Sequence, residues 1–238
     1  MTLNSRSKPG RMFDRIKKAF QRDTKERGDG APSTHAHDHV SEWAASRGMT
    51  FSSATLGSTV SMQGRVGGRP WKMELGRPSR DYINGEELRA RAELGVFEDV
   101  GAMIINRPLK ESLERRAYSM ITDTLQTTAD PRLPEEMRWL AMYDEIGWEG
   151  PPEAFWARYA VLSDKRENAL AWVDDHLIGL LMSWPEPAPA AQVPFMIVLL
   201  RGKCYLRMQH QPNQMATLDH VTEIFTSACD GALGAFRK

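Results

Sequence analysis

Two-residue alternation of apolar and polar side chains is the feature that most constrains the fold of this chain, and it is clearest on either side of Gly67-Gly68. The apolar members are Val60, Met62 and Val66 before the two glycines, and Trp71, Met73 and Leu75 after them. A period of two belongs to a strand with one buried face, and a Gly-Gly pair suits a tight two-residue turn. Residues 58–75 are therefore expected to form an antiparallel hairpin.

A second hairpin is expected near the C-terminus, where the apolar run Phe195–Leu200 is followed by Arg201-Gly202 and a strand pattern over residues 204–208. Apolar residues at helical spacing, with Gly, Pro or capping residues at the ends, mark further elements. The predicted helices cover residues 39–47, 85–96, 108–125, 134–143, 164–173, 176–183 and 214–233. Single strands are expected at residues 102–105 and 158–162.

These elements predict an α+β fold with two halves, each an antiparallel hairpin-based sheet packed with helices. The turn-rich segment 127–134 is the best internal boundary, so the halves are residues 39–130 and 131–238, which form either two domains or one. Residues 1–38 precede them as a basic amphipathic leader and a linker. Gly, Pro, Ser and charged residues dominate that linker, and such a composition is typical of flexible chain.

Charge is unevenly distributed along the chain, although 31 basic and 31 acidic residues give a formal net charge of zero. Residues 1–30 carry nine Lys and Arg and four acids, a net charge of +5. Residues 31–130 carry −1 and residues 131–238 carry −4. A neutral chain lacks the basic excess of a general nucleic-acid binder, so nucleic acid is excluded as a partner.

The basic leader contains a segment, Met12 to Arg22, whose apolar residues fall on one arc of a helix while its basic residues fill the rest. The candidate docking residues are Met12, Phe13, Ile16, Lys17, Lys18 and Phe20. A basic helix with an apolar face can lie on an anionic membrane surface or dock on a protein partner. A disordered leader, or a helix docked on the rest of this chain, is the alternative.

Cysteine content and hydropathy indicate the compartment. The chain has two cysteines and no CxxC pair, and no apolar run approaches the ~20 residues that span a bilayer. The basic N-terminus is not followed by the apolar segment of a secretory signal. We therefore expect a cytoplasmic protein, which the basic leader can hold at the inner face of the membrane.

The sequence contains no GxSxG, HExxH or Walker A lysine motif. His35, His37, Asp38 and His39 resemble the metal motif His-x-His-x-Asp-His of metallo-β-lactamases, but one residue is missing between the second His and the Asp. A flexible linker also supplies no rigid groups to orient the imidazole rings. We therefore predict no catalytic residues, no metal and no cofactor.

The densest polar cluster follows the first hairpin. Its members, the candidate ligand-binding residues, are Arg77, Arg80, Tyr82, Arg89 and Arg91. Guanidinium groups bind carboxylates and phosphates through paired hydrogen bonds, so these side chains would hold an anionic ligand if they converged in a concave pocket. The alternative is a solvated helix face on which the arginines pair with Glu86, Glu87 and Glu93.

Residues 153–208 contain the pattern Phe155-x-x-x-Tyr159-x-Val161-x-Ser163-Asp164, then an apolar helix to Leu181 and a strand with Tyr205-Leu206. This pattern resembles the C-terminal part of the bacterial domain-of-unknown-function 3137 family. The resemblance implies a strand ending in Ser-Asp, a helix and a final hairpin. Members of that family often carry N-terminal transmembrane helices, for which the basic leader would be a substitute. The family has no established activity, so the resemblance implies no site residues.

Two functions are compatible with these features. The first is a non-catalytic binding or interaction module, recruited to a membrane surface or a protein partner by its basic leader. The second is an enzyme or small-ligand sensor that binds an anionic ligand through the Arg77–Arg91 region. The arrangement of the arginines distinguishes them, because only the second function requires those side chains to converge with Tyr82.

Overall fold

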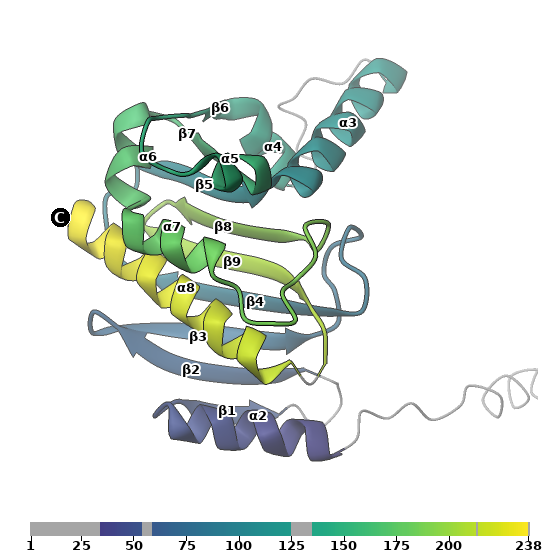
Figure 1. Cartoon of the computed structure of the whole chain (residues 1–238), viewed down its shortest axis with the longest axis vertical. Helices are drawn as coiled ribbons and strands as arrows, with labels where there is room; N and C mark the ends of the chain where they lie inside the picture. Colours follow the sequence, from purple (N-terminus) through teal and green to yellow (C-terminus); the bar gives the residue numbers. More distant parts are fainter. Residues whose placement is uncertain (1–33, 54–58, 125–134, 213, 238) are drawn as a thin grey trace, which may run out of the picture. The chain divides into compact units, whose positions relative to one another are not determined.

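The computed structural model describes residues 34–53, 59–124, 135–212 and 214–237. Contacts divide the chain into two units, Met1–Thr34 and His35–Lys238. The second unit holds the sheet and the helices that pack on it (Figure 1). The predicted amphipathic helix, with Met12, Phe13, Ile16, Lys17, Lys18 and Phe20, lies outside the described residues.

The strands of the described residues form one nine-stranded sheet in which every neighbouring pair is antiparallel. They are β1 (Thr50–Ser53), β2 (Val60–Val66), β3 (Arg69–Gly76), β4 (Glu86–Glu93), β5 (Gly101–Asn106), β6 (Asp144–Glu145), β7 (Tyr159–Ser163), β8 (Phe195–Leu200) and β9 (Lys203–His210). Their order is β1-β2-β3-β4-β9-β8-β5-β7-β6. The α+β class and the antiparallel hairpins are thus confirmed.

The expectation of a separate sheet for each half is corrected by the pairing of β4 with β9. A strand at the edge of a sheet presents unpaired backbone N–H and C=O groups, and joining two sheets edge to edge satisfies them. In addition β5, which belongs to residues 39–130, lies between β8 and β7 of residues 131–238. Strands from both predicted halves therefore alternate within one sheet.

Both predicted hairpins turn through two residues with positive φ. β2 and β3 are joined by Gly67 and Gly68, with φ of 53° and 77°. β8 and β9 are joined by Arg201 and Gly202, with φ of 52° and 71°. Positive φ at both turn positions matches the right-handed twist of the flanking strands, which is why glycine is favoured there.

One face of the sheet, the first face, is covered by the longest helix, α8, with α6 and α7 beside it (Figure 1). The helices are α2 (Thr34–Ser46), α3 (Arg107–Thr124), α4 (Glu135–Met142), α5 (Glu153–Arg158), α6 (Arg166–Trp172), α7 (Asp175–Met182) and α8 (Met215–Ala235). The buried stripe of α8 contains the predicted Leu218, Val221, Phe225 and Ala228. Phe225 packs edge-on against Trp71 of β3, with ring centroids 5.7 Å apart. The main hydrophobic core therefore lies between α8 and the first face.

The opposite or second face is covered over only part of its width. Leu109 and Leu113 of α3 and Met137 of α4 pack there on apolar side chains of β5, β7 and β8. Further across the sheet, β3, β4 and β9 present mostly charged residues on this face, in the register Lys72–Arg91–Tyr205 and Glu74–Arg89–Arg207. Side chains of opposite character thus divide the second face into an apolar half and a charged half.

The helix expected at residues 85–96 is wrong, because residues 86–93 form β4. Glu, Leu, Arg and Ala are good helix formers, but Leu88, Ala90 and Ala92 also alternate with charged residues and pack into the core of the first face. Pairing with β3 and β9 on both sides stabilises the strand over the local preference for helix. As a consequence Arg89 and Arg91 share one face of the sheet.

Helix α2 begins earlier than expected, at Thr34, so the last residues of the predicted linker are helical. It is held to α8 by Trp43, whose Nε1 donates a hydrogen bond to Asp219 over 3.0 Å. In the described part of the chain, every helix is too short or too polar to cross a bilayer.

Candidate functional site

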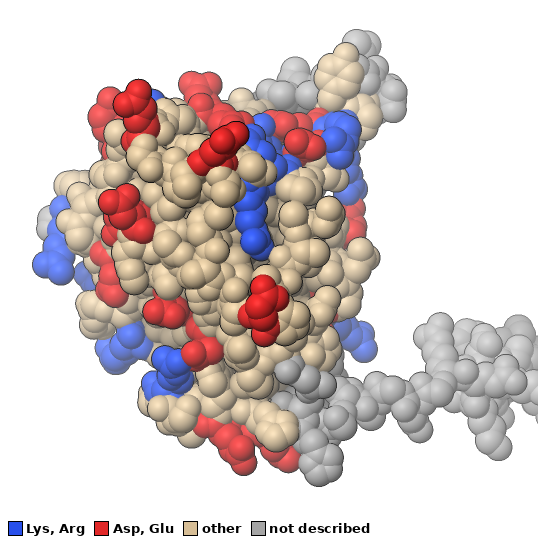
Figure 2. Space-filling model, in the orientation of Figure 1, with Lys and Arg blue, Asp and Glu red and all other residues tan. Residues whose placement is uncertain are grey.

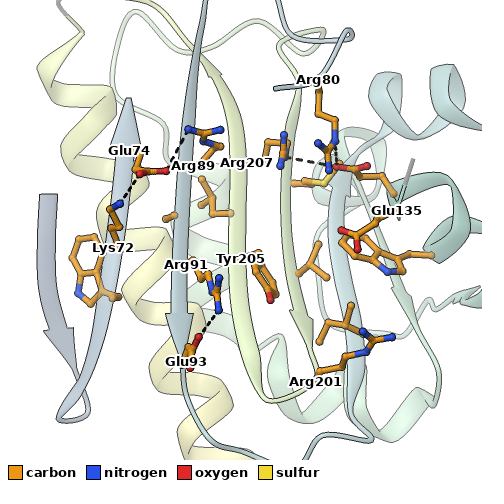
Figure 3. Close-up of a pocket in the computed structure, with 18 of the residues that line it drawn as sticks. Lys72, Glu74, Arg80, Arg89, Arg91, Glu93, Glu135, Arg201, Tyr205 and Arg207 are labelled. Atoms are coloured by element: carbon orange, nitrogen blue, oxygen red, sulfur yellow. Dashed lines mark hydrogen bonds and ion pairs between the residues drawn. The ribbon is translucent and has the colours of Figure 1, made fainter. Parts of the chain in front are cut away.

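A hollow of about 690 Å³ lies over the charged half of the second face, with the strands β3, β4, β9 and β8 as its floor (Figure 3). Residues of α4 also line it. We call it the charged hollow. Its six basic residues are Lys72, Arg80, Arg89, Arg91, Arg201 and Arg207, and its four acidic residues are Glu74, Glu93, Glu135 and Glu136. By contrast, the face seen in Figure 2 shows charges of both signs scattered among uncharged residues.

Like charges face one another across neighbouring strands of the floor. Arg89 of β4 lies directly opposite Arg207 of β9, and Lys72 of β3 lies directly opposite Arg91 of β4. Like charges directly opposite in an antiparallel pair destabilise the sheet. The sheet thus places four positive side chains next to one another, where they repel each other.

Carboxylates at the margins offset part of this repulsion. Glu74 lies 2.6 Å from Lys72 Nζ and 3.3 Å from an Arg89 terminal nitrogen. Glu93 pairs with Arg91 and lies 3.4 Å from Lys203 Nζ. The hydrogen bond from Arg91, together with Lys203, lowers the pKa of Glu93, so this carboxylate stays ionised.

One end of the charged hollow contains a buried network of charges. Glu87, which is fully buried, accepts a hydrogen bond of 2.5 Å from the Ser79 N–H and pairs with Arg207. Glu136 of α4, which is also buried, accepts a hydrogen bond of 2.8 Å from Arg80 Nε. Arg207 Nε lies 3.7 Å from the same Glu136 carboxylate. Each buried carboxylate therefore has a guanidinium partner, as burial of a charge requires.

Tyr82 joins this network from the loop between β3 and β4. Its hydroxyl donates a hydrogen bond of 3.2 Å to Glu136. Burial, and then the negative charge of Glu136, raises the pKa of Tyr82 well above its usual value. The phenol is therefore neutral and acts as a donor that positions Glu136.

Some polar atoms of the charged hollow have no partner among the described residues. Arg89 Nε and Glu136 Oε2 are both buried and unpaired there. An unpaired buried polar atom costs about 1–3 kcal/mol, so such atoms are exceptions that call for an explanation. Within the described part of the chain, Arg89 Nε is a donor that lacks an acceptor, whereas Glu136 Oε2 is an acceptor that lacks a donor.

The structure brings together three of the five candidate ligand-binding residues. Arg80, Arg89 and Arg91 line the charged hollow, and Tyr82 lies behind it on Glu136. Arg77 is exposed and is absent from the lining. The sequence presents two alternatives for these arginines, convergence in a pocket or pairing with carboxylates. In the structure the arginines do both.

Sequence reasoning missed the contributions of β3 and of the second hairpin. The residues concerned are Lys72, Arg201, Tyr205 and Arg207. The alternation of Lys203, Tyr205 and Arg207 with buried residues places these three on one face, and the alternation along β4 does the same for its arginines. The residues of β4 and those of β9 are over one hundred positions apart in the sequence. They form one site only because the two strands pair.

Metal coordination finds no support in the described part of the chain, where no three His, Cys, Asp or Glu side chains are grouped to hold an ion. Of the histidine tract, only His39 has a described side chain, and it is exposed. His210 is buried on the first face, and burial lowers its pKa to about 4. His220 contacts the Leu180 carbonyl through Nε2 at 2.8 Å.

Comparison with known proteins assigns no family. No family model matches the chain, and no curated protein matches it. Among solved structures, the mycobacterial trehalose monomycolate transport factor A, TtfA, aligns with 12% sequence identity and a TM-score of 0.46. The alignment covers 83% of this chain and 94% of that chain. A likeness at this level determines neither the family nor the function of this chain, and the resemblance of residues 153–208 to the domain-of-unknown-function 3137 family stays a prediction.

Proposed function

We propose that this chain is a non-catalytic binding protein and that the charged hollow holds an anionic ligand. The observation that carries the proposal is the register of like charges, Arg89 opposite Arg207 and Lys72 opposite Arg91. Nearby carboxylates offset part of the repulsion among these cations, and an anionic ligand would supply further compensation. A bound anion would lie among four positive side chains.

The donors available in the charged hollow support an oxyanion as the ligand group. The Arg89 and Arg91 side chains are partly exposed, and Arg91 has only one terminal nitrogen bonded to a carboxylate. Guanidinium groups with free donors bind carboxylates, phosphates and sulfonates through paired hydrogen bonds. Among the described residues, the lining contains no Ser, Thr, Cys or His, and its four acidic residues all pair with cations, namely Glu74, Glu93, Glu135 and Glu136. Such side chains favour binding over nucleophilic or general-base chemistry.

The test is thermal unfolding of the full chain with citrate, against NaCl at the same ionic strength. Citrate at about ten times its Kd should stabilise the protein by about 1.4 kcal/mol, which is about 4 °C in Tm for a unit of this size. The variant Arg89→Gln/Arg91→Gln should lose this gain, because it removes two central guanidinium groups. Both side chains are partly exposed, so the variant should still fold.

A matched control removes the same charge elsewhere. Arg65→Gln/Arg115→Gln lies outside the charged hollow and should keep the full citrate effect. Equal stabilisation of the two double variants would rule out the charged hollow as the anion site. A wild type that gains no stability from citrate, inorganic phosphate or sulfate would remove the proposal altogether.

Recruitment by the basic leader is a second, separate proposal. Its support is the sequence alone, namely the apolar arc and the net charge of +5 in residues 1–30. The anionic lipids on the inner face of a membrane would attract a positive leader, and a cytoplasmic protein is exposed to that face. The alternative is that the leader binds an unidentified protein partner instead of a membrane.

A further inference from the structure

One side of the charged hollow is lined by apolar residues, next to the side that carries the arginines. Crossing from β9 to β8, the floor changes from polar to apolar: Tyr205 faces Val198, and Arg207 faces Met196. Leu200 and Trp139 extend the apolar side and are partly exposed. Adjacent strands lie about 4.8 Å apart, so the guanidinium groups and the apolar surface are within reach of one small molecule.

Tyr205 lies at the boundary between the two sides. Its ring centroid is 5.9 Å from the guanidinium carbon of Arg91 on β4, and Val198 lies on its other flank. A phenol ring so placed offers a flat surface to an apolar group while its neighbour offers a positive charge. An inorganic anion would use only the charged side and leave this surface in water.

We infer that the ligand is a small amphipathic organic anion, with its oxyanion among Arg89, Arg91 and Arg207 and its apolar body against Tyr205, Leu200 and Trp139. This inference rests on the proposed function and adds the apolar requirement to it. A volume of about 690 Å³ lies within the range of sites for drug-sized ligands, so a body of one or two rings or a short chain fits.

The experiment compares three probes on the full chain. The amphipathic probe is 8-anilinonaphthalene-1-sulfonate, which carries a sulfonate on an apolar body. The neutral probe, N-phenyl-1-naphthylamine, has nearly the same body without the charge. Methanesulfonate has the charge without the body. Fluorescence titration gives the Kd of the first two, and competition gives that of the third. The amphipathic probe should bind at least about tenfold more tightly than either of the others. The neutral probe lacks a charged hydrogen bond, which contributes about that factor, and methanesulfonate lacks the apolar contact of the rings.

Variants separate the two sides of the site. Arg89→Gln/Arg91→Gln should weaken the amphipathic probe by about tenfold or more, and Arg65→Gln/Arg115→Gln should leave it unchanged. Leu200→Ser should weaken it by about fivefold through lost apolar contact, without reducing the citrate effect. Leu170→Ser is the matched control, since Leu170 is an exposed leucine on α6 outside the charged hollow. Circular dichroism and urea unfolding check that each variant is folded.

Displacement of the amphipathic probe by other compounds shows which kind of apolar group the site accepts. Decanoate presents a chain and 2-naphthoate presents a ring, and displacement by either supports the inference. Binding of the amphipathic probe that is unchanged in Leu200→Ser, or equal binding of the neutral probe, overturns it. If citrate still stabilises the wild type through Arg89 and Arg91, the proposed function stands without the inference. If neither citrate nor the sulfonate probe depends on these arginines, both fail.

Discussion

His210 is a buried titratable side chain whose burial can be tested through pH. It lies at the end of β9 on the first face, 5% exposed, and its Nδ1 has no partner among the described residues. Burial lowers its pKa from 6.5 to about 4, because the charged imidazolium cannot be solvated there. The folded protein therefore holds this histidine neutral at pH values where an unfolded chain would protonate it.

We predict that acidification destabilises the wild type through this residue. Above pH 6.5 both states are neutral, and between pH 6.5 and 4 only the unfolded chain takes up the proton, so stability falls as pH falls. From pH 7 to pH 5 this loss amounts to about 2 kcal/mol. His210→Gln should lose about that much less over the same interval, measured by urea unfolding at each pH.

The exposed His176 supplies the control for this pH series. His176→Gln makes the same substitution at an exposed position and so controls for the change of residue itself. A His210→Gln variant with the same pH dependence as the wild type would contradict the buried, neutral state of His210.

At the residue scale, the sequence names Arg77, Arg80, Arg89 and Arg91 as candidates and leaves open whether they converge; all but Arg77 line the charged hollow. Arg80, Arg89 and Arg91 were identifiable because they lie close together in the chain. Arg207 and Tyr205 come from a strand over one hundred residues away, and only the β4–β9 pairing makes them neighbours. Non-local pairing of this kind leaves no signal in local composition.

At the scale of elements, whether residues 86–93 form a helix or a strand decides whether Arg89 and Arg91 belong to one site. In a helix, residues two apart point to different sides, so Arg89 and Arg91 would diverge. In the strand they are parallel and lie beside Arg207 and Tyr205. The two hairpins were predictable because their turns carry glycine and their strands are either alternating or, in β8, a continuous apolar run. By contrast, β4 is built from residues with high helix propensity.

The turn between β2 and β3 illustrates how elements are held together. Gly67 has a positive φ of 53°, and a Cβ added there would lie 2.4 Å from Leu233 Cδ1 of α8. Gly68, with φ of 77°, has open space around such a Cβ. The turn therefore packs closely under the C-terminal part of α8 only at its first glycine.

Alanine at each glycine should separate backbone strain from packing. Gly68→Ala should cost about 1–2 kcal/mol, the usual penalty of a left-handed conformation for an L-residue. Gly67→Ala should cost up to about 1 kcal/mol more, because the end of the Leu233 side chain must move as well. Urea unfolding of both variants measures the difference, and equal losses would show that the turn does not support α8.

At the scale of the whole molecule, one sheet with two dissimilar faces accounts for both the core and the site. α8 with α6 and α7 covers the first face, and α3 with α4 covers part of the second. The remaining part of the second face stays charged, and the hollow forms where α4 stands beside it. The sequence predicts the fold class and many of the elements but makes β4 a helix, and the order of strands depends on contacts that no local pattern contains.

The unequal charge of the chain supports a prediction about residues 1–30, which carry +5 while the rest carries −5. A basic amphipathic segment gains apolar contact and about 1 kcal/mol per Lys or Arg at an anionic surface. The full chain should therefore float with vesicles of phosphatidylglycerol and phosphatidylcholine, and less in 0.5 M NaCl, where the Debye length is shorter. Vesicles of phosphatidylcholine alone should bind it weakly.

Point variants are preferable to truncation at Asp38, because that cut would remove the first turn of α2. Phe13→Asp/Phe20→Asp should abolish flotation by removing apolar contact and adding negative charge, and Lys17→Gln/Lys18→Gln should weaken it. Phe97→Asp tests an exposed phenylalanine in the described part of the chain and should have no effect. Undiminished flotation of Phe13→Asp/Phe20→Asp would contradict membrane recruitment by the leader, since an apolar face that contributes nothing to binding cannot be its anchor.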